Sequence, residues 1–103
     1  MEKETKTYLT GIDIDYVNDM GFFKGIDYHG RLFSGFCYKK NIKDNKIEVR
    51  VVSDVFKFGE VGKKPNYCVV IPVNSLSFQV NNGKSVCQDR ISVKPENLEE
   101  ITE

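Results

Sequence analysis

Apolar and polar side chains alternate with a period of two residues along much of this chain, and that alternation limits the folds open to it. Between residues 8 and 16, one set of alternate positions carries Tyr, Thr and Ile, and the other set includes Asp13 and Asp15. A period of two is typical of a β-strand with one buried face. The same alternation recurs at residues 47–55 and 76–80. These segments are therefore predicted to be strands.

The composition favours strands over helices. The chain contains no Ala, the best helix former, and no Trp. Val, Ile, Phe, Tyr and Thr, which suit strands, are frequent. We therefore predict an all-β fold with five or six short antiparallel strands in a small barrel. An SH3-like barrel is favoured, and an OB-like barrel or a small sandwich is the alternative. The 103 residues should form one domain, with flexible tails at residues 1–6 and 102–103.

Turn-forming residues predict where several strands end. Residues 28–31 are expected to turn between two strands of a hairpin. The pair Asp44-Asn45 is expected to form another turn, because both residue types tolerate positive φ. The pair Asn82-Gly83 is the strongest hairpin signal in the chain.

Other irregularities predict a bulge, a loop and a helical turn. The alternation changes phase near Ser53, which predicts a β-bulge. Residues 18–24 interrupt the alternation and are expected to form a loop. Residues 67–73 are apolar on both faces, as in a central strand, but Pro72 would limit that strand to its early part or place it at an edge. Pro95 is expected to open a short helical turn over residues 95–101.

No targeting or spanning segment is recognised. The first ten residues are charged and polar, and no stretch approaches the roughly 18 apolar residues that cross a bilayer. The cysteines Cys37, Cys68 and Cys87 are odd in number and lack CxxC spacing. We expect three reduced thiols packed as small apolar groups, in a cytoplasmic protein that does not contact a membrane.

The aspartates of residues 11–28 raise the question of a metal site. Asp13, Asp15 and Asp19 would supply the oxygen ligands that Mg²⁺ or Ca²⁺ prefers if the following loop folded back. Their spacing lacks the Gly and Glu of an EF-hand loop. We instead predict a solvated outer face that keeps an edge strand from pairing with other chains, and no metal site.

The residue patterns of common catalytic sites are missing. His29 is the single histidine, so any Ser-His-Asp or Cys-His arrangement would have to use it, and it lies in a predicted turn. Residues 59–65 lack the glycine spacing of a phosphate loop, and Pro65 would prevent the helix that follows one. We therefore predict no catalytic residue, no cofactor and no enzyme activity.

Two adjacent aromatic residues offer a protein-binding site. Phe22 and Phe23 lie in the predicted loop and cannot both face inward on one strand. With Met20, they would form an exposed apolar cluster of the kind that dominates protein interfaces. The first hypothesis is a non-catalytic interaction module that binds a protein partner, and self-association is compatible with it. The richness in Lys, Asn and Ile suggests a phage, plasmid or low-GC bacterial origin.

Basic and aromatic residues are interleaved in the middle of the chain and give an alternative hypothesis. Residues 31–64 contain nine basic and four acidic residues, whereas the whole chain is neutral. Small barrels that bind single-stranded nucleic acid combine a basic groove with stacking aromatic rings. Because lysine provides charge rather than base reading, such binding would be weak and tolerant of sequence. The candidate residues are Tyr38, Lys39, Lys40, Phe56, Lys57, Phe58, Lys63, Lys64 and Tyr67.

Overall fold

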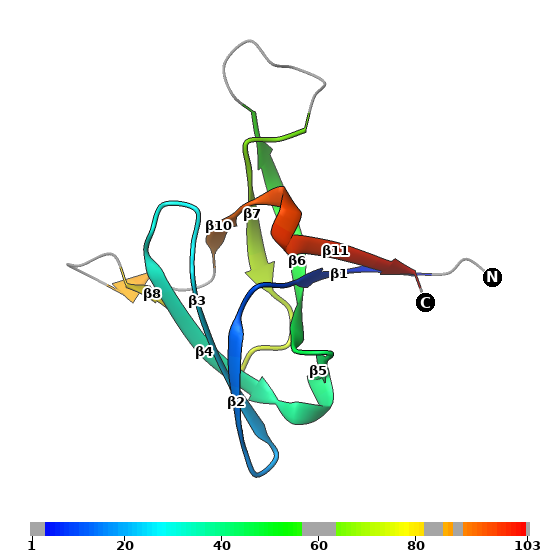
Figure 1. Ribbon diagram of the computed structural model, residues 1–103, viewed down its shortest axis with the longest axis vertical. Helices are drawn as coiled ribbons and strands as arrows, with labels where there is room; N and C mark the ends of the chain where they lie inside the picture. Colours follow the sequence, from blue (N-terminus) through cyan, green and yellow to red (C-terminus); the bar gives the residue numbers. More distant parts are fainter. Residues whose placement is uncertain (1–3, 57–63, 82–85, 88–89, 103) are drawn as a thin grey trace.

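The alternating segments form strands, and the strands make two antiparallel sheets (Figure 1). The computed structural model describes residues 4–56, 64–81, 86–87 and 90–102. The six-stranded sheet has the order β10 (Ile91–Val93), β7 (Tyr67–Pro72), β6 (Lys46–Val55), β1 (Thr5–Leu9) and β11 (Leu98–Thr102), with β5 (Ile42–Lys43) paired to β6. The five-stranded sheet has the order β2 (Asp13–Val17), β3 (Met20–Ile26), β4 (Leu32–Tyr38), β8 (Ser77–Asn81) and β9 (Val86–Cys87). The predicted all-β class is confirmed.

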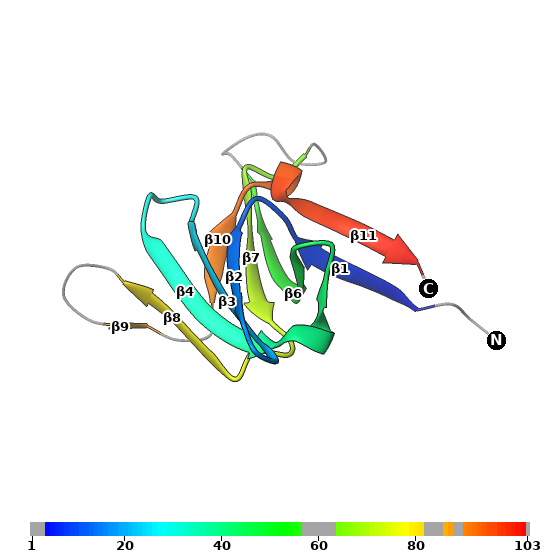
Figure 2. The ribbon, with the colours of Figure 1, turned by 60° about the horizontal axis from the view of Figure 1, so that its bottom comes forward.

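One hydrophobic core lies between the two sheets, which Figure 2 shows from a second direction. The six-stranded sheet contributes Leu9, Ile47, Val49, Cys68, Val70, Ile91 and Val93. The five-stranded sheet contributes Phe23, Phe33, Cys37, Phe78 and Val80. Alternate residues of each strand face this core, as the period of two requires. Among the described strands, no strand of one sheet pairs with a strand of the other. None of the observed pairs therefore closes a barrel.

The single strand predicted over residues 8–16 is in fact two strands in different sheets. β1 ends at Leu9, β2 begins at Asp13, and the chain bends between them at Gly11, whose φ is +72°. Glycine reaches this conformation without the steric cost of a Cβ atom. The Thr10 N–H donates a 2.7 Å hydrogen bond to the carbonyl of Asn97, which fixes the bend against a later segment.

The prediction of a loop over residues 18–24 is wrong. Only Asn18 and Asp19 form a turn, and β3 begins directly afterwards at Met20. Asn18 has a φ of 55°, a conformation that Asn tolerates better than most residues. The alternation did not indicate this strand because Gly21, rather than an apolar side chain, occupies the inward position before Phe23.

The predicted turns and bulge that lie in the described residues are confirmed. Asp44 and Asn45 have φ angles of 51° and 60°, as a two-residue hairpin turn of type I′ requires. The β3–β4 connection falls at residues 27–31. The register of β6 against β7 shifts between Val51 and Ser53, where the bulge was predicted.

The Asn82-Gly83 turn lies outside the described residues, although β8 and β9 on either side of it pair antiparallel as predicted. β7 lies between β10 and β6, so residues 67–72 form a central strand that ends at Pro72, and the alternative of an edge strand is wrong.

The C-terminal segment is only partly the predicted helical turn. The 3₁₀ helix η2 (Pro95–Asn97) begins at its proline, but residues 98–102 form β11 and pair with β1. Thr5, Lys6 and Thr102 therefore belong to strands rather than to the predicted flexible tails. The β1–β11 pair extends away from the remaining strands in both views (Figures 1 and 2).

Candidate functional site

Five apolar side chains gather on the outer face of the five-stranded sheet, on the side away from the core. We call this surface the Phe22 face; it consists of Val17, Met20, Phe22, Phe36 and Tyr38. The exposed fractions are 54% for Val17 and 44% each for Phe22 and Tyr38. The other two side chains are half-buried.

Strand register places these side chains together. Val17 pairs with Met20, and Met20 pairs with Tyr38, which gives one row across three strands. In the next row on this face, Phe22 lies opposite Phe36, and their ring centroids are 5.5 Å apart. Residues that lie directly opposite each other in a ladder contact on the same face, so the two rows make a continuous apolar surface.

Charged and polar side chains border the Phe22 face. Asp15 lies opposite Phe22, and Asp13 lies opposite Lys24 one row further along. A shallow hollow of about 300 Å³ opens beside the two phenylalanine rings. Its polar wall is formed by Asp15, Lys24, Ser34, Ser77 and Gln79. An apolar centre with a polar rim is the usual arrangement of a protein interface.

The structure separates the three predicted partner-binding residues. Phe22 and Met20 lie on the outer face, but Phe23 points into the core and is 1% exposed. Phe23 therefore cannot contact a partner, because strand β3 sends neighbouring side chains to opposite faces. Val17, Phe36 and Tyr38 also belong to this surface, although their sequence pattern does not predict it. Only the pairing of three strands reveals that they share it.

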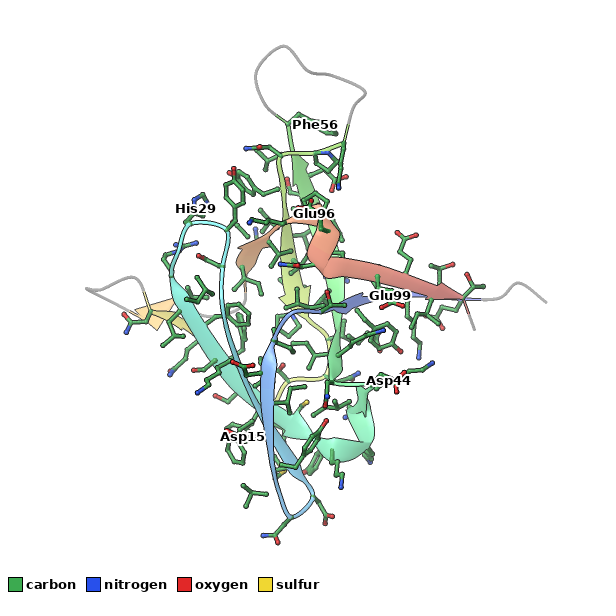
Figure 3. The ribbon with its side chains drawn as sticks, viewed as in Figure 1. Asp15, His29, Asp44, Phe56, Glu96 and Glu99 are labelled. Carbon is green, nitrogen blue, oxygen red and sulfur yellow. The ribbon has the colours of Figure 1, made fainter. Side chains whose placement is uncertain are left out.

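The predicted nucleic-acid residues that the structure describes do not form one surface. Tyr38, Lys39 and Lys40 lie where β4 passes into η1 (Lys39–Asn41), at the end of the molecule opposite Phe56 (Figures 1 and 3). The Lys39 and Lys40 ammonium groups lie 5.4 Å and 5.6 Å from the ring centroids of Tyr16 and Tyr38.

Among the described candidates, Phe56, Lys64 and Tyr67 lie at the β6–β7 end of the molecule. Lys64 forms a 3.1 Å ion pair with Glu96, and its hydrogen bond lowers the pKa of that carboxyl group. The Tyr67 ring stacks on Tyr28 at 4.7 Å. Lys57, Phe58 and Lys63 lie outside the described residues.

His29 lies in the β3–β4 turn (Figure 3), as the sequence predicted, and its ring packs against two tyrosine rings. Its ring centroid is 5.3 Å from that of Tyr28 and 5.2 Å from that of Tyr67. The Tyr28 hydroxyl accepts a 2.9 Å hydrogen bond from Asn66. These contacts join the β3–β4 turn to the start of β7.

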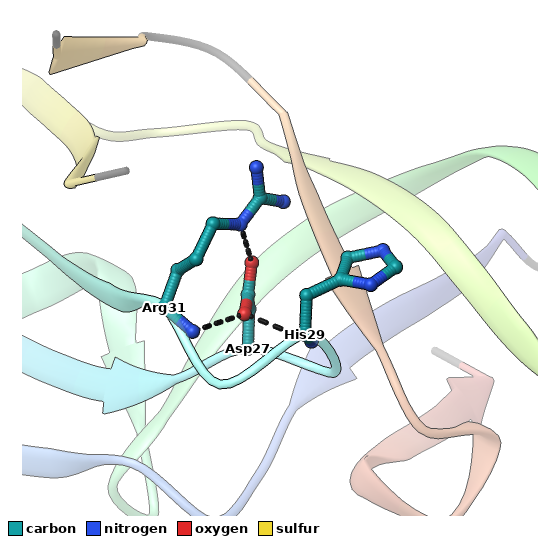
Figure 4. Close-up of polar contacts among 3 residues, drawn as sticks. All are labelled: Asp27, His29 and Arg31. Atoms are coloured by element: carbon teal, nitrogen blue, oxygen red, sulfur yellow. Dashed lines mark hydrogen bonds and ion pairs between the residues drawn. The ribbon is translucent and has the colours of Figure 1, made fainter. Parts of the chain in front are cut away.

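Asp27 organises the same turn and was not recognised from the sequence (Figure 4). Its Oδ1 accepts hydrogen bonds from the backbone N–H groups of His29 at 3.0 Å and Arg31 at 2.7 Å. Its Oδ2 accepts a 2.8 Å bond from the Arg31 Nε, and the Asp27 side chain is fully buried. A buried carboxylate with three donors is structurally satisfied. The signal available was an Asp at the start of a Gly-containing turn with Arg four residues later.

Two of the three thiols are buried and unpaired, as predicted. Cys37 and Cys68 lie in the core, and burial raises the pKa of each thiol. For Cys68, a hydrogen bond to Asp54 and that residue's negative charge add to the effect of burial, and its pKa rises to about 11. Such thiols are poor nucleophiles at neutral pH because the thiolate is scarce. The Cys87 side chain lies outside the described part.

The aspartates do not converge. Asp13 and Asp15 share the outer face of β2, which is an edge strand as predicted, while Asp19 lies in the turn beyond it. Within the ranges that the structure describes, no group of three Cys, His, Asp or Glu side chains is placed to hold a metal ion.

None of the helical segments in the described ranges has the length and apolar character needed to cross a bilayer.

Comparison with known proteins gives no relative: no family model, no curated protein and no solved structure matches this chain.

Proposed function

We propose that this chain is a non-catalytic interaction module that binds a protein partner through the Phe22 face. The observation that carries the proposal is the exposure of aromatic and aliphatic side chains in two adjacent rows of one sheet. Contiguous apolar patches rimmed by polar residues mark interaction sites on many soluble proteins. A cytoplasmic location and an SH3-like arrangement of the strands are part of this proposal.

The aromatic residues of the Phe22 face are suited to binding because their rings are already ordered. Phe22 and Phe36 contact each other across two paired strands, so little side-chain freedom remains to be lost when a partner covers them. Aromatic anchors near the centre of an interface commonly provide most of its binding energy. Met20, which is flexible and polarisable, lies beside them and can adapt to different partner surfaces.

Support for a non-catalytic role comes from the titratable groups that most often serve in catalysis. His29 packs its ring against tyrosines, and Asp27 is held by backbone groups and Arg31. The buried thiols of Cys37 and Cys68 are kept protonated. Each of these groups contributes to the fold through its contacts.

A weak nucleic-acid binder is the alternative proposal. One observation favours it: Tyr67 joins Tyr28 and His29 in an aromatic cluster. Two observations count against it. Lys64 is paired with Glu96, and the Tyr38–Lys40 group lies at the other end of the molecule.

The proposal can be tested with two phenylalanines of similar exposure. Phe22 is 44% exposed and Phe56, on the β6–β7 side, is 41% exposed. Tagged wild type, Phe22→Ser and Phe56→Ser would be used to capture partners from a lysate of the source cells. We expect Phe22→Ser to lose the captured protein and Phe56→Ser to keep it. Circular dichroism and thermal unfolding would verify that both variants are folded.

The same three proteins would be titrated with labelled single-stranded oligonucleotides at low and at moderate salt. Electrostatic binding weakens steeply as salt rises. Oligonucleotide binding that is lost in Phe56→Ser, together with protein capture that is unaffected by Phe22→Ser, would replace the first proposal with the second.

A further inference from the structure

We propose that the free edge of β2 binds an extended, basic segment of the protein partner, which adds to the five-stranded sheet as a new strand. This inference rests on the proposed function, because the Phe22 face begins at the same strand. β2 is the outermost strand of the sheet, and within the described ranges no strand pairs with its second edge. An unpaired strand edge presents backbone donors and acceptors that another chain can use.

The hairpin geometry identifies which backbone groups face outward. Asn18 and Asp19 form a two-residue turn, so Val17 and Met20 are the pair that the turn's hydrogen bond closes. Hydrogen-bonded and non-hydrogen-bonded pairs alternate along an antiparallel ladder. Ile14 and Tyr16 therefore direct their N–H and C=O groups away from β3, toward an added strand.

The side chains along this edge specify the chemistry of that strand. Asp13, Asp15 and Val17 share the outer face of β2, and all three are exposed. Neither aspartate forms an ion pair with a described residue. On an added antiparallel strand, the residues opposite them would belong to non-hydrogen-bonded pairs, whose side chains approach closely at a Cα separation of about 4.5 Å. Arg or Lys two positions apart, preceded by an apolar residue opposite Val17, fits this edge.

The occupant is not a second copy of β2. Antiparallel pairing of two β2 strands about Asp15 would place Asp15 opposite its counterpart, and like charges directly opposite each other are destabilising. Carboxylates on an edge strand commonly repel unwanted partners. The same charges make this edge selective for a strand of opposite charge.

The free edge of β11 lacks this combination. Glu99 is already paired with Lys46 of β6. Glu99 and Glu100 are neighbours in the strand, so their side chains point to opposite faces. β11 therefore provides a matched control, with two exposed acids on a free edge that does not adjoin the Phe22 face.

The probe is a fluorescent peptide with the core Val-Thr-Arg-Thr-Arg, compared with the same peptide carrying Glu in place of both Arg. Binding would be measured by fluorescence anisotropy at low salt to wild type, to Asp13→Lys/Asp15→Lys and to Glu99→Lys/Glu100→Lys. We expect wild type and the β11 variant to prefer the Arg peptide. The β2 variant should bind the Arg peptide about tenfold more weakly and should prefer the Glu peptide.

N-methylated forms of the Arg peptide test the backbone pairing. Methyl groups on the two Thr nitrogens would face β2 and should abolish binding, whereas methyl groups on the two Arg nitrogens would face away and should be tolerated. The proposal is overturned if the Arg peptide does not bind wild type, if both methylated peptides behave alike, or if the β2 variant keeps the wild-type preference.

These failures would not by themselves remove the proposed function. Protein capture that depends on Phe22 but is unchanged in Asp13→Lys/Asp15→Lys would keep the Phe22 face as the docking site and exclude strand addition at β2. Loss of the Phe22 dependence would instead remove the proposed function.

Discussion

Two aspartates that follow the same Gly-Ile pair have different roles in this chain. Asp13 and Asp27 each end a Gly-Ile-Asp triplet. Asp13 is exposed on the outer face of β2, whereas Asp27 is buried and accepts three hydrogen bonds. The residues after each triplet decide the difference, because only the second triplet is succeeded by a turn that returns Arg31 to its aspartate.

Replacing Asp27 should therefore destabilise the chain far more than replacing Asp13. In Asp27→Ala, two backbone N–H groups and the Arg31 guanidinium lose their acceptor, and we expect a loss of about 3 kcal/mol in the free energy of unfolding. Asp13→Ala should change it by about 0.5 kcal/mol or less. Urea denaturation of both variants measures the difference. Equal effects would show that the three hydrogen bonds to Asp27 add no net stability.

At the scale of single elements, the β3–β4 hairpin depends on glycines that face the core. A Cβ atom on Gly35 would lie 2.3 Å from the carbonyl oxygen of Ser77 and 2.7 Å from the Phe23 ring. The absence of a side chain allows β4 to approach β8 while the Phe23 ring fills the core beneath it.

Gly35→Ala should consequently strain the pairing of β4 with β8. The added methyl group meets a backbone atom that cannot rotate away, so we expect a loss of about 2 kcal/mol or more in unfolding free energy. Ser34→Ala, one residue earlier and on the outer face, should be close to neutral. Chemical denaturation would reveal the contrast, and a Gly35→Ala variant as stable as wild type would contradict it.

The elements differ in how well the sequence predicted them. Alternation predicted the strands at residues 47–55 and 76–80, and residue types that tolerate positive φ predicted the turn at Asp44-Asn45, because each of these signals is local. It failed at β3, where inward glycines replace the apolar residues that would have marked the core face. It also failed to assemble the Phe22 face. Side chains from three strands meet there only through register, which is a long-range property.

At the scale of the whole molecule, the buried thiols link stability to alkaline pH. Cys68 has its pKa raised from 9.0 to about 11 in the folded chain. Above pH 9 the thiol ionises in the unfolded chain while it stays protonated in the folded one, so the unfolded state gains stability. The contribution of the Cys68 thiol to the free energy of unfolding is therefore constant below pH 9 and should decrease from there to about pH 11.

The pH dependence can be isolated by comparing wild type with Cys68→Ala. Tyrosine and lysine side chains also titrate in this range, but they are common to both proteins. The unfolding free energy of both proteins would be measured with urea at a series of pH values. We expect it to fall more steeply above pH 9 in wild type than in Cys68→Ala. Parallel curves would mean that Cys68 ionises equally in both states.

The position of β1 has a consequence for the order in which the chain can be assembled. β1 pairs with β6 near the middle of the sequence and with β11 near its end, and Thr10 bonds to Asn97 across a separation of 87 residues. Contacts between such distant residues form slowly, because a long loop must close first. During synthesis, β1 leaves the ribosome before every other strand of its sheet. Its second edge stays uncovered until residues 98–102 have been synthesised and have paired with it.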